Sequence, residues 1–151
     1  MQPGDPVFGM HGKMSVGEGT LAQYVVASPG TIARRPADMD ATLGAALSLA
    51  GASALQMVEA ASLNEGDAVL VLGAAGCIGS IVLQLAAAAG TLPIAVTRTV
   101  NDEYVRRLGA AELVDYERQD VFETVGRGAF GTAILNPLAV HASRPPRRVI
   151  W

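Results

Sequence analysis

Apolar residues in the middle of the chain follow two periods, short continuous runs and helical spacing. Ala68–Leu72 is a short apolar run, typical of a parallel strand buried on both faces. A glycine-rich turn follows, and apolar side chains then recur through residues 78–89 at the spacing of one helix face. Gly90 is a helix stop, and Leu92–Thr97 predicts a second strand with its proline at the edge. Together these segments predict a βαβ unit of about thirty residues.

The same alternation continues toward the C-terminus. Residues 102–108 predict a helix, Glu112–Asp115 a third strand, Val121–Val125 a short helix and Thr132–Leu135 a fourth strand. Alternating strands and helices favour an open, doubly wound parallel sheet. The fold class predicted for this part of the chain is therefore α/β.

The N-terminal part has a different pattern. Residues 1–40 combine glycine and proline turn signals with two segments of strand-forming residues, 20–26 and 31–34. Asp40 is placed to cap a helix running to about residue 47, and residues 53–61 predict another helical stretch. We expect a small β region, then helix, before the first long strand.

The last sixteen residues, 136–151, contain three prolines and three arginines. Such a composition fits neither a core strand nor a helix. We predict an irregular tail, and an arginine-rich interaction peptide is the alternative.

A membrane-spanning segment is an alternative for residues 68–97, which carry no charge and are long enough to cross a bilayer. Three glycines and Pro93 would break a single helix there, and no aromatic belt or basic cluster flanks the segment. A buried strand-helix-strand unit explains the same run, so no membrane contact is predicted.

Composition narrows the class of protein further. A net charge of −3 without basic clusters argues against nucleic acid as a partner. A single cysteine excludes an internal disulfide framework and a thiolate zinc cluster, and two distant histidines make a metal site improbable. With no signal peptide at the N-terminus, the predicted location is cytoplasmic.

The turn after the first long strand has the spacing G-x-x-G-x-x-G, at Gly73, Gly76 and Gly79. Glycines allow positive φ and close approach of a ligand to the backbone, and the N–H groups at a helix start hold an anion. The predicted site for a dinucleotide pyrophosphate comprises Ala75, Gly76, Cys77, Ile78 and Gly79. The alternative is a tight turn without a ligand. For Cys77, a reactive thiol and a small residue that fills the turn are both open.

The end of the second strand decides between the two nicotinamide coenzymes. NAD-binding units usually place an acid there, whereas this chain has Thr97 and Arg98 and no acid until Asp102. Arg98 is able to pair with a 2′-phosphate in a charge-assisted contact. The prediction is NADP(H) rather than NAD(H).

Five segments in the same order and spacing resemble one known family. The chain resembles the zinc-free quinone oxidoreductase branch of the medium-chain dehydrogenase/reductase superfamily through residues 4–9, 19–26, 45–54, 66–76 and 108–116. The resemblance implies a remnant of a GroES-like β domain at 1–42, a partial Rossmann domain at 43–135 and an irregular tail at 136–151. It also implies hydride transfer from NADPH to a small-molecule quinone or enone.

The resemblance implies two further cofactor contacts. Tyr116 stands where the family has a tyrosine near the adenosine ribose phosphate, and Ser53 stands where it has a threonine near the nicotinamide. Structural roles for both are the alternatives. Asn101 replaces a lysine that the family usually has. No nucleophile–base pair identifies a catalytic residue, which is consistent with chemistry supplied by a cofactor.

Family members are about twice as long, so the resemblance implies a chain truncated at both ends, with Asn136 and Pro137 departing from the family's fourth strand. Three interpretations stay open. The chain is an NADPH-dependent oxidoreductase, a non-catalytic NADP-binding fragment associating with a homologous chain, or a product that does not fold alone. The third and fourth strands would be exposed sheet edges, a route to homo-oligomers.

Overall fold

The computed structural model describes residues 1–12, 19–125, 132–135 and 149–150. Two compact units make up the chain, Met1–Ala52 and Ser53–Trp151. The division falls inside helix α1, Ala41–Ala61. Whether the first unit is the remnant of a GroES-like domain, with its boundary at residue 42, stays a prediction.

The first unit contains a small antiparallel hairpin. Strand β1 (Val7–Gly9) pairs with β2 (Ile32–Arg34), which follows the 3₁₀ turn η1 (Pro29–Thr31). The pairing bears out the short strand expected at 31–34. Close to the hairpin, Arg34 Nη2 donates to Asp5 Oδ1 at 2.6 Å, so an ion pair ties the N-terminal turn to β2.

Residues 20–26 do not form the predicted strand. They adopt a bend and an irregular segment, and the side chains of Leu21, Tyr24 and Val26 are almost fully exposed. The prediction relied on strand-forming residues alone, and a strand is stable only when its backbone groups pair with a neighbour. In the described part of the first unit, the two paired strands are β1 and β2.

Helix α1 is one continuous element where the sequence predicted two stretches. Asp40 caps it as expected, since Asp40 Oδ1 accepts from the N–H of Thr42 at 2.8 Å. Residues 48–52, left out of both predicted stretches, continue the helix, because alanine and leucine offset the unfavourable Gly51. Among the described residues, α1 is the one helix whose length and apolar composition would allow it to cross a membrane.

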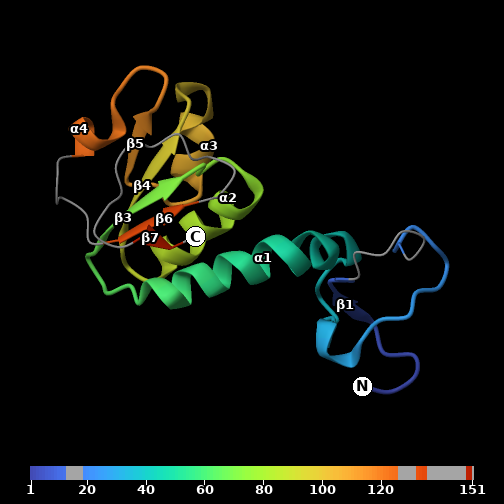
Figure 1. Cartoon of the computed structure of the whole chain (residues 1–151). Helices are drawn as coiled ribbons and strands as arrows, with labels where there is room; N and C mark the ends of the chain where they lie inside the picture. The colour runs from blue at the N-terminus through green and yellow to red at the C-terminus, as the bar shows by residue number, and fades with distance from the viewer. Residues whose placement is uncertain (13–18, 126–131, 136–148, 151) are drawn as a thin grey trace. The chain divides into compact units, whose positions relative to one another are not determined.

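The second unit contains a five-stranded parallel sheet, in which one helix connects the first strand to the second, another connects the second to the third, and a further helix follows the third (Figure 1). Its strands are β3 (Ala68–Leu72), β4 (Leu92–Thr97), β5 (Glu112–Asp115), β6 (Thr132–Leu135) and β7 (Val149–Ile150). Its helices are α2 (Cys77–Ala88), α3 (Asp102–Arg107) and α4 (Val121–Val125), with the 3₁₀ turn η2 (Thr99–Asn101) before α3. The bounds of β3 to β6 and of the three helices agree closely with those expected from the apolar periodicity. Strand β7 was not expected, because it lies in the segment predicted to be an irregular tail.

The strand order is β5-β4-β3-β6-β7. The chain moves outward from β3 in one direction through β4 and β5, and β6 then pairs with the other side of β3. This reversal is the order 3-2-1-4-5 of a doubly wound Rossmann-type sheet. The predicted α/β fold class is confirmed, and residues 68–97 are a strand, a helix and a strand rather than one membrane span.

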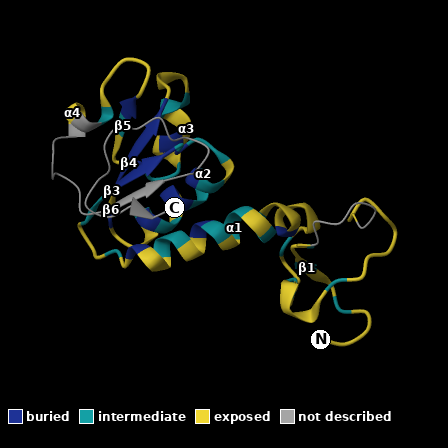
Figure 2. Ribbon diagram, in the orientation of Figure 1, coloured by how far each residue is buried: buried dark blue, intermediate teal, exposed yellow. Residues whose placement is uncertain are grey.

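Alternate residues of β3 face two apolar layers. Val69 and Val71 pack with α2 residues Val82 and Leu83, and this layer also takes in Ala54 and Ala61 of α1. Leu70 and Leu72 pack on the opposite side with residues of β4 and β5: Ile94, Val96 and Val114. Burial of β3 on both faces explains its uninterrupted apolar sequence (Figure 2).

The end of the chain departs from the expected edge of the sheet. Val149 and Ile150 form β7, which pairs in parallel with β6. The fourth strand was expected to be an edge, and this pairing makes it an inner strand instead. Local composition could not show the pairing because β7 depends on a partner distant in sequence. Asn136 and Pro137 lie outside the described residues.

Candidate functional site

The turn between β3 and α2 has the backbone that its glycines predict. Gly73, directly after the strand, has φ of +68°, a conformation that side chains with a Cβ rarely adopt. The N–H of Gly76 donates to the carbonyl of Gly73 at 2.9 Å and closes the turn. Gly76 itself is extended, with φ of −81° and ψ of 174°, and is the cap residue of α2.

Gly79 allows the helix to lie directly on the turn. A Cβ at this position would be 2.3 Å from the carbonyl oxygen of Gly73 and 2.8 Å from Cα of Ala74. Both neighbours are backbone atoms, so no side chain can move aside. The third glycine of the motif therefore sets a close strand–helix approach, which is one of its roles in dinucleotide-binding turns.

The start of α2 presents unpaired amide donors. The N–H of Ser80 is bonded to the carbonyl of Gly76 at 2.9 Å, whereas the preceding N–H groups of a helix have no partner within it. Gly76 offers no side chain to cap them, and the first turn contains no acid. Donors at a helix start, together with the helix dipole, are suited to an anion such as a diphosphate.

The predicted pyrophosphate residues are therefore one structural group. Ala75 and Gly76 form the turn, Cys77 and Ile78 begin the helix, and Gly79 packs against the turn. The Cys77 thiol is free and exposed. Whether it is reactive, and whether these residues contact a cofactor, stay predictions.

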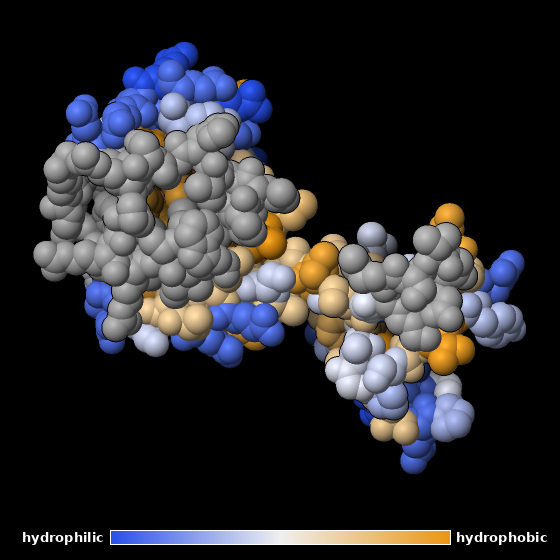
Figure 3. Space-filling view, in the orientation of Figure 1, coloured by the Kyte–Doolittle hydropathy of each residue, from blue (hydrophilic) through white to orange (hydrophobic). Residues whose placement is uncertain are grey.

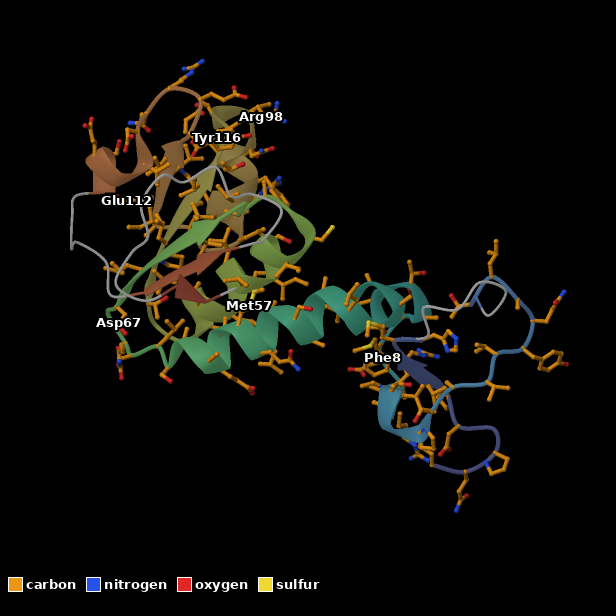
Figure 4. The ribbon with its side chains drawn as sticks, in the orientation of Figure 1. Phe8, Met57, Asp67, Arg98, Glu112 and Tyr116 are labelled. Carbon is orange, nitrogen blue, oxygen red and sulfur yellow. The ribbon has the colours of Figure 1, made fainter. Side chains whose placement is uncertain are left out.

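A second group lies at the carboxyl ends of the neighbouring strands β4 and β5. Thr97 is paired in register with Asp115, so the next residues, Arg98 and Tyr116, leave adjacent strands at the same edge. Both of these side chains are exposed, and Figure 4 shows them close together at that end of the sheet. Their arrangement fits the two contacts predicted around a 2′-phosphate.

The two groups share one edge of the sheet because β3 and β4 are adjacent and parallel. A hydrogen bond from the N–H of Ala74 to the carbonyl of Val96, at 3.3 Å, connects the glycine turn to the end of β4. In Figure 3, hydrophilic residues gather over the end of the unit where α3 lies. A cofactor reaching from the glycine turn toward Arg98 would follow the carboxyl edge.

Sequence reasoning missed the role of Asp115, a buried carboxylate beside Tyr116. Its Oδ2 accepts from the N–H of Thr99 at 2.8 Å and from the Thr99 hydroxyl, while Oδ1 accepts from the N–H of Glu117 at 3.0 Å. These hydrogen bonds, those of Thr99 first, lower the pKa of Asp115. An acid as the last residue of an apolar strand was the available signal.

Two other predicted positions are placed differently. Asn101 stands where the family has a lysine, and its Nδ2 donates to Oγ1 of Thr97 at 2.9 Å, so it holds the η2 turn. Ser53 is half-buried within α1, at the start of the second unit. Nothing places Ser53 with the other site residues, and its nicotinamide contact stays a prediction. Among the described residues, no cluster of His, Cys, Asp or Glu is arranged to hold a metal ion.

A parallel doubly wound sheet with this turn at its carboxyl edge defines the Rossmann-type class of α/β proteins. No protein-family model matches the chain. Medium chain reductase pydE of Acremonium sp is 37% identical over 138 residues, covering 78% of this chain and 38% of the relative. The 2-methylene-furan-3-one reductase of Solanum lycopersicum is 33% identical over 144 residues, covering 85% of this chain and 37% of that relative.

Solved structures agree with these relatives. The quinone oxidoreductase from Coxiella burnetii matches with a TM-score of 0.80 and 30% identity, over 89% of this chain and 42% of that one. The Escherichia coli quinone oxidoreductase complexed with NADPH matches with a TM-score of 0.60 and 25% identity, over 63% of this chain and 30% of that one. The chain belongs to the quinone and enone oxidoreductases of the medium-chain dehydrogenase/reductase superfamily. It spans about two fifths of the length of these first relatives.

Proposed function

We propose that the chain binds NADP(H) along the carboxyl edge of its sheet and acts as a zinc-independent reductase of quinones or enones. The observation that carries the proposal is the placement of Arg98 and Tyr116 side by side, on the same edge as the glycine turn. The support from relatives is that one reduces a furanone and that the Escherichia coli enzyme is complexed with NADPH.

Each part of the site has a defined task under this proposal. The amides at the start of α2 would bind the diphosphate, and the Arg98 guanidinium would bind the 2′-phosphate. Tyr116 would border the adenosine ribose. When bound, the reduced nicotinamide supplies the hydride, and residues of this chain hold and orient it.

The residues at the end of β4 also support NADP(H) over NAD(H). Here Thr97 is buried, and Arg98 is the first exposed residue after it. The nearest carboxylate in register, Asp115, is occupied by Thr99 and Glu117. The turn directly after β4 therefore offers no acid for the ribose hydroxyls of NAD before Asp102, which pairs with Arg106.

Titration of the purified chain with NADPH and NADH tests the proposal. We expect NADPH to bind more tightly, and Arg98→Ala to weaken NADPH by about 10- to 100-fold while leaving NADH nearly unchanged, since a hydrogen bond to a charged group is lost. Arg107→Ala, on exposed α3, is the matched control and should change neither affinity. Tighter binding of NADH than of NADPH by the wild-type chain would reject the cofactor assignment.

The reductase part of the proposal is tested separately. NADPH oxidation is followed with a benzoquinone and with a small α,β-unsaturated ketone as acceptors, after treatment with a zinc chelator. We expect cofactor-dependent reduction that the chelator does not change. If the chain binds the cofactor but reduces neither acceptor, it is a nucleotide-binding chain and the proposed reductase activity is wrong. Cytoplasmic location and association through a sheet edge stay predictions.

A further inference from the structure

The carboxylate of Asp115 joins the two turns that carry the proposed 2′-phosphate contacts. Thr99 follows Arg98 in the turn after β4, and Glu117 follows Tyr116 in the turn after β5. Oδ2 of Asp115 holds the first turn and Oδ1 holds the second. One side chain therefore connects the backbone beside Arg98 to the backbone beside Tyr116.

From this geometry we infer that Asp115 is a positioning residue that gives the site its preference for a 2′-phosphorylated nucleotide. This inference rests on the proposed function, because it concerns the same site. Asp115 touches no ligand in this role. It acts through Thr99 and Glu117, which set the spacing of the Arg98 and Tyr116 backbones.

The burial and the charged surroundings of Asp115 suit it to positioning the two turns, and not to direct contact with the nucleotide. The residue is 5% exposed, and its two oxygens accept three hydrogen bonds. Arg118 Nε lies 3.8 Å from Oδ2 and provides a positive charge. A carboxylate with satisfied oxygens does not compete for the ribose hydroxyls.

Asparagine at this position separates positioning from charge. Asn has one oxygen, so it can hold one turn as an acceptor but not both. Loss of the negative charge alone would strengthen binding of a phosphate, whereas loss of a turn would weaken it. The two explanations predict opposite signs for NADPH affinity in Asp115→Asn.

The experiment measures dissociation constants of the full chain for NADPH and NADH, and the melting temperature of each variant. We expect Asp115→Asn to weaken NADPH by roughly fivefold and NADH much less, because one hydrogen bond that orders the site is lost. Thr99→Val, which removes only the hydroxyl donor, should shift the NADPH/NADH ratio in the same direction. Thr99→Ser retains the hydroxyl and should keep the wild-type ratio.

Asp67→Asn is the matched control. Asp67 Oδ2 accepts from the N–H of Asn64 at 2.8 Å, so it also holds a turn, but at the amino end of β3. Figure 4 shows Asp67 at the end of the sheet away from Arg98 and Tyr116. Its substitution should lower the melting temperature without changing the nucleotide ratio.

The outcomes separate this inference from the proposed function. A wild-type chain without preference for NADPH contradicts both. A wild-type preference that Asp115→Asn leaves unchanged, or increases, overturns the positioning role and leaves the function standing. An equal loss of both nucleotides shows a merely structural role and also overturns it. If Asp115→Asn does not fold, Thr99→Val decides between the same outcomes.

Discussion

At the scale of single residues, Gly79 shows how one missing methyl group shapes the site. Its Cα faces the carbonyl of Gly73 so closely that a Cβ would stand 2.3 Å from that oxygen. The glycine turn and the start of α2 are held together at this point. Since every atom of the contact is backbone, relief would require the helix to move away from β3.

We predict that Gly79→Ala destabilises the chain by about 3 kcal/mol, the upper end of the usual cost of overpacking, because rigid backbone opposes the new methyl. Urea unfolding measures the change in free energy. Gly30→Ala is the control, since a Cβ there meets nothing within 4 Å and should change stability little. An unaltered unfolding midpoint for Gly79→Ala would contradict the packing described here.

At the scale of elements, carboxylates hold the ends of strands and helices. Asp115 joins the turns after β4 and β5, and Asp40 caps α1. The hydrogen bonds from Thr99 and Thr42 keep the pKa of Asp115 and of Asp40 below the ordinary value. The start of α1 and the turns after β4 and β5 therefore depend on ionised side chains.

These pKa shifts predict sensitivity to acid. A carboxyl with a lowered folded-state pKa stabilises the fold fully above its unfolded value, 3.8, and the contribution is lost as pH falls toward the folded pKa. We expect the melting temperature to decrease once the pH is lowered below about 4. Asp115→Asn should be less stable at neutral pH and should lose less on acidification. The same acid dependence in wild type and variant would show that Asp115 makes no such contribution.

At the scale of the whole molecule, the proposed cofactor binding would be coupled to folding of the second unit. The glycine turn and the ends of β4 and β5 belong to one parallel sheet, so a ligand on its carboxyl edge contacts several elements at once. A ligand that binds only the folded state raises its stability. The sheet edges in the described residues are β5 and β7.

We expect NADPH at a hundred times its dissociation constant to stabilise the chain by about 2.7 kcal/mol. A thermal melt with increasing NADPH measures the effect, with NADH at the same concentrations as comparison. A melt that shifts equally with both, or with neither, would contradict selective binding to the folded sheet. A chain without a cooperative melt would show instead that it does not fold alone.

Much of the second unit could be predicted from local pattern. The strands Ala68–Leu72 and Leu92–Thr97 were expected with the bounds they have, because buried parallel strands are continuous apolar runs bounded by turn residues. The glycine turn was recognised for a similar reason, since positive φ at Gly73 and close packing at Gly79 restrict the residue type. Arg98 and Tyr116 were proposed singly, and the register of β4 and β5 brings them together.

The errors fall where partners distant in sequence decide the outcome. Residues 20–26 have strand-forming side chains yet no strand, whereas Val149–Ile150 form one beside β6. The sequence by itself determined the α/β class, the glycine turn and its helix, because these follow from local spacing and backbone freedom. Only the tertiary structure decided which strands pair and that Asp115 connects two turns, because hydrogen bonds between distant segments depend on their positions in space.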